Sequence, residues 1–136
     1  MVPISISDSM KTNVPEIDAQ HKELIDRINA VISMGVDAFT IEETQKTVEF
    51  LGEYIIKHFS YEEKMQEKCG YPDLEIHKKL HKQFIFNFEL MKKELVENGP
   101  TYAFAQTLNN SIVGWIIRHI KTVDVDFGKF YNENVK

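Results

Sequence analysis

Histidine and carboxylate side chains recur at helical spacing along this 136-residue sequence. The stretch EIHKKLHKQF places His77 and His81 four positions apart, and KHFSYEEK places Glu62 four positions after His58. Residues four apart in an α-helix project from the same face, one turn from each other. Because imidazole and carboxylate together suit iron, zinc or manganese, these pairs are candidate metal ligands.

The remaining histidines extend this pattern to the whole chain. Apolar neighbours such as Leu80 and Phe84 place the histidines at the edge of the predicted core. A single histidine in such a place is more often a hydrogen-bonded interior residue than a ligand. Several around one interior need partners, since an unpaired buried polar group costs about 1 to 3 kcal/mol, and one metal site would serve them all. The five histidines are His21, His58, His77, His81 and His119.

Four segments with helical periodicity must position these side chains. They cover about residues 18–33, 40–68, 72–96 and 101–120, and the last pattern weakens toward residue 130. Asp18 is the predicted N-cap of the first segment, TIEE at Thr40 resembles a capping box, and Gly99 ends the third. Helices of this length joined by short turns predict an all-α, antiparallel up-down-up-down four-helix bundle. We expect one domain over residues 1–136, with an extended N-terminal arm (1–17) and the bundle at 18–131.

Composition and charge restrict the function classes. The formal charge of −5 gives no basic surface, so we expect no nucleic acid as a partner. Apolar runs stay well below the roughly 20 residues that span a bilayer, so we expect no membrane insertion. A single cysteine cannot form an internal disulfide, which agrees with a cytoplasmic protein. We expect a monomer.

Two common metal-site patterns do not fit the sequence. HKKLH has Lys78 where a zinc protease helix needs glutamate. Ferritin-like di-iron proteins use glutamate three residues before histidine, and none of the five histidines has a glutamate there. The predicted site is therefore rich in nitrogen ligands.

The stretches IDAQHKEL, HFSYEE, GYPDLEIHKKLHKQF and WIIRHIKTVD resemble the hemerythrin family, most of all its single-domain bacterial members. The resemblance covers about residues 18–131 and implies two non-haem iron ions with an oxo or hydroxo bridge. It also implies reversible dioxygen binding by a carrier, store or delivery protein that is not an enzyme and that serves an oxygen-consuming partner. By the family motif, His77, His81 and His119 bind one iron, His21 and His58 bind the other, and Glu62 and Asp124 bridge them.

This implied ligand set leaves one coordination position open. Five imidazole nitrogens, four carboxylate oxygens and one shared bridge occupy all but one of the twelve positions of two six-coordinate irons. The open position falls on the iron with two histidines, where dioxygen would bind. The resemblance also places Trp115, Ile116 and Ile120 around the oxygen pocket, although such a stripe is equally typical of plain core.

The aspartate ligand is ambiguous by spacing alone. Asp124 follows His119 by five residues and would lie about 140° away on an ideal helix, whereas Asp126 would lie within about 20°. Family spacing favours Asp124, which requires a π-bulge between His119 and Asp124. We expect Asp124 to be the ligand.

Two arm residues depart from the bacterial pattern, and two other functions stay open. Ile6 stands where relatives usually have tryptophan, and Asn13 stands where they usually have glycine. The alternatives are a di-iron enzyme acting on peroxide, nitric oxide or ferrous iron, and an oxygen sensor that works through a separate partner. No acid or base besides the ligands is evident in the sequence, which disfavours a peroxidase.

Overall fold

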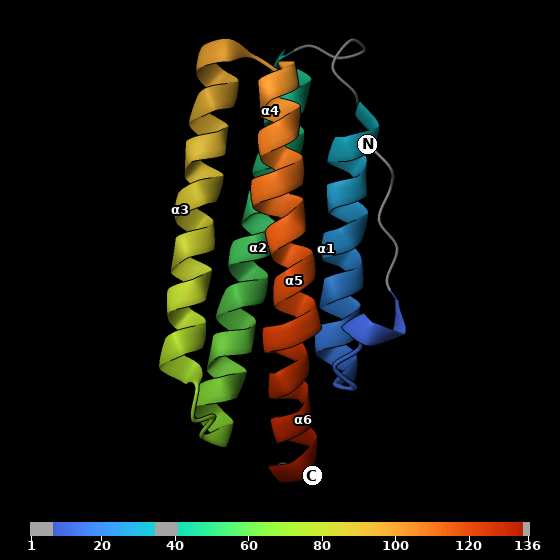
Figure 1. The fold of residues 1–136 in the computed structure, drawn as a ribbon, viewed down its shortest axis with the longest axis vertical. Helices are drawn as coiled ribbons and strands as arrows, with labels where there is room; N and C mark the ends of the chain where they lie inside the picture. The colour runs from blue at the N-terminus through green and yellow to red at the C-terminus, as the bar shows by residue number, and fades with distance from the viewer. Residues whose placement is uncertain (1–6, 35–40, 135–136) are drawn as a thin grey trace.

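The chain folds into four antiparallel rods (Figure 1). The computed structural model describes residues 7–34 and 41–134, and these contain helices and no strand. The first three rods are α1 (Pro15–Met34), α2 (Ile41–Cys69) and α3 (Leu74–Asn98). The fourth rod is continuous and contains two π-helical segments, which confirms the predicted all-α bundle and extends its last helix beyond residue 130. Its parts are α4 (Tyr102–Thr107), η2 (Leu108–Val113), α5 (Gly114–His119), η3 (Ile120–Asp124) and α6 (Val125–Asn134).

The first helix begins at Pro15, three residues before the predicted boundary. The predicted N-cap role of Asp18 is therefore wrong, and proline occupies the first helical position, where its missing N–H costs nothing. Asp18 accepts hydrogen bonds from the Thr12 backbone N–H at 2.9 Å and from the Thr12 hydroxyl at 2.8 Å. It also accepts one from the Asn13 N–H at 3.2 Å. Asp18 thus fastens the N-terminal arm to α1.

The arm turns sharply at Asn13, whose φ is 62°. Asparagine tolerates this left-handed conformation better than most residues, so it can replace the glycine usual at this position. Met10 and Val14 on either side of the turn are buried against the bundle. Ile6 and the predicted capping box at Thr40 lie outside the described residues.

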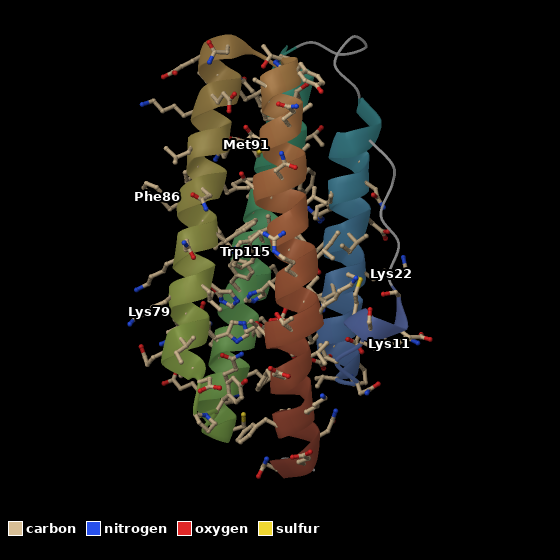
Figure 2. The ribbon with its side chains drawn as sticks, viewed as in Figure 1. Lys11, Lys22, Lys79, Phe86, Met91 and Trp115 are labelled. Atoms are coloured by element: carbon tan, nitrogen blue, oxygen red, sulfur yellow. The ribbon has the colours of Figure 1, made fainter. Side chains whose placement is uncertain are left out.

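A polar layer divides the bundle interior into two apolar parts. The larger cluster contains Leu51 and Phe84 and runs toward the α3–α4 end, and Met91 lies inside it while Lys22 and Lys79 project outward (Figure 2). The smaller cluster consists of Val14, Ile17 and Phe127 with their partly buried neighbours at the other end. The predicted ligands fall between the two clusters in every rod, so packing on both sides fixes their height in the bundle.

In the described part of the chain, none of the helices combines the length with the apolar character that crossing a membrane requires.

We predict that Gly128→Ala destabilises the fold because α6 approaches the arm closely at this glycine. A Cβ at position 128 would lie 2.3 Å from the Thr12 carbonyl oxygen, so the arm would have to move. The expected loss is about 1 to 3 kcal/mol in the free energy of unfolding, measured by urea denaturation. Lys129→Ala, at the exposed neighbouring position, is the control. Equal stability of the two variants would contradict this account of the arm.

Candidate metal centre

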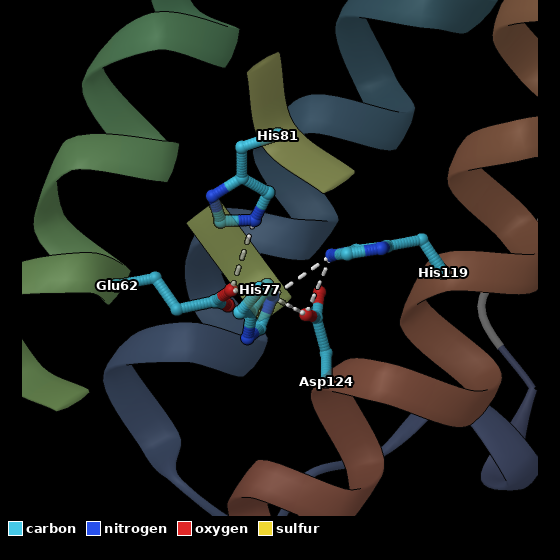
Figure 3. A group of neighbouring side chains, drawn as sticks. All are labelled: Glu62, His77, His81, His119 and Asp124. Atoms are coloured by element: carbon cyan, nitrogen blue, oxygen red, sulfur yellow. Dashed lines mark hydrogen bonds and ion pairs between the residues drawn. The ribbon is translucent and has the colours of Figure 1, made fainter. Parts of the chain in front are cut away.

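All seven predicted ligands lie in the polar layer, and all seven are buried. They form two overlapping groups, one with three histidines and one with two, and both groups include the same two carboxylates. Figure 3 shows the first group, whose side chains converge from three rods on a common centre. By rod, the residues are His21 from α1, His58 and Glu62 from α2, His77 and His81 from α3, and His119 and Asp124 from the fourth rod.

Glu62 divides its two oxygens between the two groups. Oε1 lies 2.8 Å from His77 Nε2 and 3.4 Å from His81 Nε2, both in the three-histidine group. Oε2 lies 3.7 Å from His58 Nε2 in the two-histidine group. The side chain is fully buried, so bulk water does not satisfy either oxygen.

Asp124 divides its oxygens in the same way. Oδ1 lies 3.0 Å from both His77 Nε2 and His119 Nε2, while Oδ2 lies 2.9 Å from His21 Nε2. Two carboxylates that each face both groups have the arrangement expected of ligands bridging two cations.

The π-helical segment η3 gives Asp124 its position. It spans Ile120–Asp124, directly after His119. Its wider turn, closed by hydrogen bonds to the fifth residue, returns a residue five positions on to the same face. The π-bulge required by the family spacing is therefore present, and Asp126 is exposed to solvent.

Protons alone do not satisfy these atoms. His77 Nε2 lies within 3.0 Å of Glu62 Oε1, Asp124 Oδ1 and His119 Nε2, yet it can carry one proton at most. Both Glu62 oxygens, Asp124 Oδ1 and His81 Nε2 lack a hydrogen-bond partner among the described residues. The ligand atoms of each group lie within 4.8 Å of one another, and several of them have no hydrogen-bond partner among the described residues. The residues therefore fit a pair of cations, and their chemistry suits a di-iron site.

The metal-free cluster retains protons where its carboxylates and imidazoles meet. Burial and the Asp124 charge raise the pKa of Glu62 to about 8. Burial opposes protonation of His77, but its contacts with Asp124 and Glu62 prevail and raise its pKa to about 9. Burial and neighbouring imidazoles lower the pKa of His58 to about 3 and that of His81 to about 2.

Three residues that contact the imidazoles at Nδ1 were not predicted from the sequence. Gln20 Oε1 lies 2.7 Å from His58 Nδ1, and Glu63 Oε2 lies 2.7 Å from His81 Nδ1. The amide nitrogen of Gln66, Nε2, lies 2.5 Å from His77 Nδ1. The spacing offered one signal, since Gln66 follows Glu62 by four residues and so shares its face. All three contacts cross between rods, so no spacing within one rod predicts the contacts themselves.

The three predicted pocket residues lie on the side of the large apolar cluster. Ile116 and Ile120 are buried, and the half-buried Trp115 stacks on His119 with ring centroids 4.4 Å apart. Phe59 stacks on His81 at 3.8 Å in the same manner. Aromatic rings therefore cover two imidazoles of the three-histidine group, and a role of these residues in binding dioxygen stays a prediction.

The fold and the site together define a class of protein, the helical bundles with a buried, histidine-rich cluster that could hold a metal. Within that class, the chain belongs to the hemerythrin family. The family model "Hemerythrin HHE cation binding domain" matches residues 12–130.

Three relatives show the extent of the similarity. A bacteriohemerythrin of Methylococcus capsulatus is 30% identical over 122 residues, which cover 86% of this chain and 87% of the relative. A bacteriohemerythrin of Pseudomonas paraeruginosa is 27% identical over 126 residues, covering 88% and 76% respectively. A myohemerythrin of Sipunculus nudus is 26% identical over 125 residues, covering 92% and 91%.

We predict that ferrous iron binds the metal-free protein more tightly as the pH rises. Glu62 and His77 hold protons at pH 7 and must lose them to become ligands, so protons compete with the metal. The affinity should rise by about tenfold per pH unit for each proton displaced, until the pH passes the raised pKa values. Anaerobic competition with a chelator of known protonation, at pH 6.5 and 8.5, measures the change. Equal affinities at the two pH values would show that these protons are misassigned.

Proposed function

We propose that this chain binds dioxygen reversibly at a non-haem di-iron centre and works as an oxygen carrier, store or delivery protein. The observation that carries the proposal is the division of each buried carboxylate between two histidine groups of unequal size. In this proposal the three-histidine group and the two-histidine group each hold one iron, and Glu62 and Asp124 belong to both.

The unequal groups supply the asymmetry that gas binding needs. With the two carboxylates and an oxo or hydroxo bridge shared, three histidines would complete the coordination of one iron, and two histidines would leave one position free on the other. Two ferrous ions so held supply that position and the electrons for reversible dioxygen binding. His21 and His58 therefore mark the half of the centre where dioxygen binds.

Apolar side chains pack against the histidines on the side of the large cluster. Ile55, Phe59, Ile116 and Ile120 are buried in the large apolar cluster next to the histidines. A dry, apolar environment disfavours the release of charged reduced oxygen species and so slows irreversible oxidation of the irons. This favours a protein that returns its oxygen intact.

One of the hydroxyl groups near His58 in the sequence, that of Tyr61, is engaged by another side chain. The Tyr61 hydroxyl donates to Glu16, and the Tyr54 ring packs under the Arg27 guanidinium, 4.6 Å from its carbon. A peroxide- or nitric-oxide-consuming enzyme would use a proton donor aimed at the open position. The engagement of the Tyr61 hydroxyl by Glu16 favours binding over catalysis.

Reversible binding has a direct spectroscopic test. Anaerobic ferrous protein exposed to air should develop a visible absorption band that disappears under argon and returns on re-exposure. The band should survive repeated cycles because the ligands are buried and pack against the large apolar cluster. Immediate irreversible oxidation, with turnover of added peroxide, would instead indicate an enzyme.

The choice of aspartate is tested by a matched pair of variants. Asp124→Ala should lower bound iron well below two per chain, because it removes a ligand shared by both groups. Asp126→Ala removes the same charge from an exposed position two residues away and should leave iron content unchanged. Iron is measured by metal analysis after anaerobic ferrous loading. Loss of iron from the Asp126 variant alone would reverse the assignment.

A further inference from the structure

The three imidazoles with a polar partner at Nδ1 do not have the same kind of partner. Gln20 and Gln66 contact His58 and His77 through neutral amides. His81 contacts the carboxylate of Glu63, at 2.7 Å. Of these three contacts, the charged one lies in the three-histidine group.

Two side chains of α2 hold His81. The Phe59 ring stacks on the imidazole at 3.8 Å with an angle of 2° between the planes. Glu63, one turn further along α2, is the carboxylate at Nδ1. One contact fixes the plane of the ring and the other fixes its rotation, so α2 orients a histidine that α3 supplies.

The hydrogen bond also selects the form of the imidazole. A carboxylate accepts, so the His81 Nδ1–H donates to Glu63 Oε2 and the Nε2 lone pair is left free. Nε2 is the atom that faces the centre, 3.4 Å from Glu62 Oε1. A negative charge behind an imidazole makes it a stronger metal ligand, and losing such a partner typically costs about 10- to 100-fold in metal affinity.

We infer that Glu63 is a positioning residue that makes the three-histidine group the tighter-binding half of the centre. The inference rests on the proposed di-iron site. It adds that the two halves of this site bind iron with different affinities. Through His81, Glu63 directs electron density toward one half, while amides serve His77 and His58. The three-histidine iron is then retained while the two-histidine half remains the reactive one.

Glu63→Gln tests this inference, because it keeps the shape of the side chain and an acceptor oxygen but removes the charge. In ferrous-loaded protein challenged with a chelator, one iron per chain should leave about 10- to 100-fold faster than in the wild type, and the other should leave at an unchanged rate. The midpoint potential should rise, since a negative charge near the irons is lost. Glu67→Gln removes the same charge one turn further along α2, from an exposed side chain, and should match the wild type in both measurements.

A purely structural role for Glu63 would have a different result. Thermal unfolding of the metal-free Glu63→Gln variant should equal that of the wild type if Glu63 acts through His81 on the metal. Wild-type release rates, equal acceleration of both irons, or an unchanged potential would overturn the inference. If the wild type holds two irons but does not bind dioxygen reversibly, the proposed function fails, and the release rates still decide the role of Glu63. A chain that takes up no iron would overturn both.

Discussion

The bundle buries five imidazoles and two carboxylates at one level, and every rod must pack around them. Each unsatisfied buried polar group costs about 1 to 3 kcal/mol, and here several such groups face one another between two apolar clusters. Cations that bind these nitrogen and oxygen ligands would satisfy them together and so stabilise the fold. The polar layer therefore explains both the family's metal chemistry and the apolar packing above and below it.

Each rod contributes different ligands to this layer. Histidines four apart on α3 and a histidine–glutamate pair on α2 use ordinary helical geometry, and α1 adds His21. The fourth rod departs from that geometry, since η3 is needed to bring Asp124 under His119. Asp18 holds the arm, which contributes Val14 to the smaller apolar cluster. Gly128 permits the close approach of α6 to the arm at Thr12. Of the two π-helical segments, η3 is the one that the site requires.

Much of this arrangement was predictable from the sequence because it follows helical periodicity. The helices and the shared face of His77 and His81 follow from spacings of three and four, and the antiparallel arrangement follows from the short turns between the helices. Asp124 did not follow, because ideal geometry favours Asp126 and the π turn has no strong sequence signal. The N-cap prediction for Asp18 was wrong because an aspartate after a proline is typical both of an N-cap and of the first turn of a helix. Here α1 begins at Pro15, so Asp18 lies in the first turn. Spacing favours Glu62 over its neighbour Glu63 as the ligand, and the contact of Glu63 with His81 was not predicted because His81 lies on another rod.

We propose that the cluster holds two irons that share both carboxylates. Crystals of iron-loaded protein measured at the iron absorption edge test it most directly. The account predicts two anomalous peaks roughly 3.5 to 4 Å apart, one among His77, His81 and His119 and the other beside His21 and His58, with Glu62 and Asp124 contacting both. A single peak, or peaks away from the two carboxylates, would contradict it.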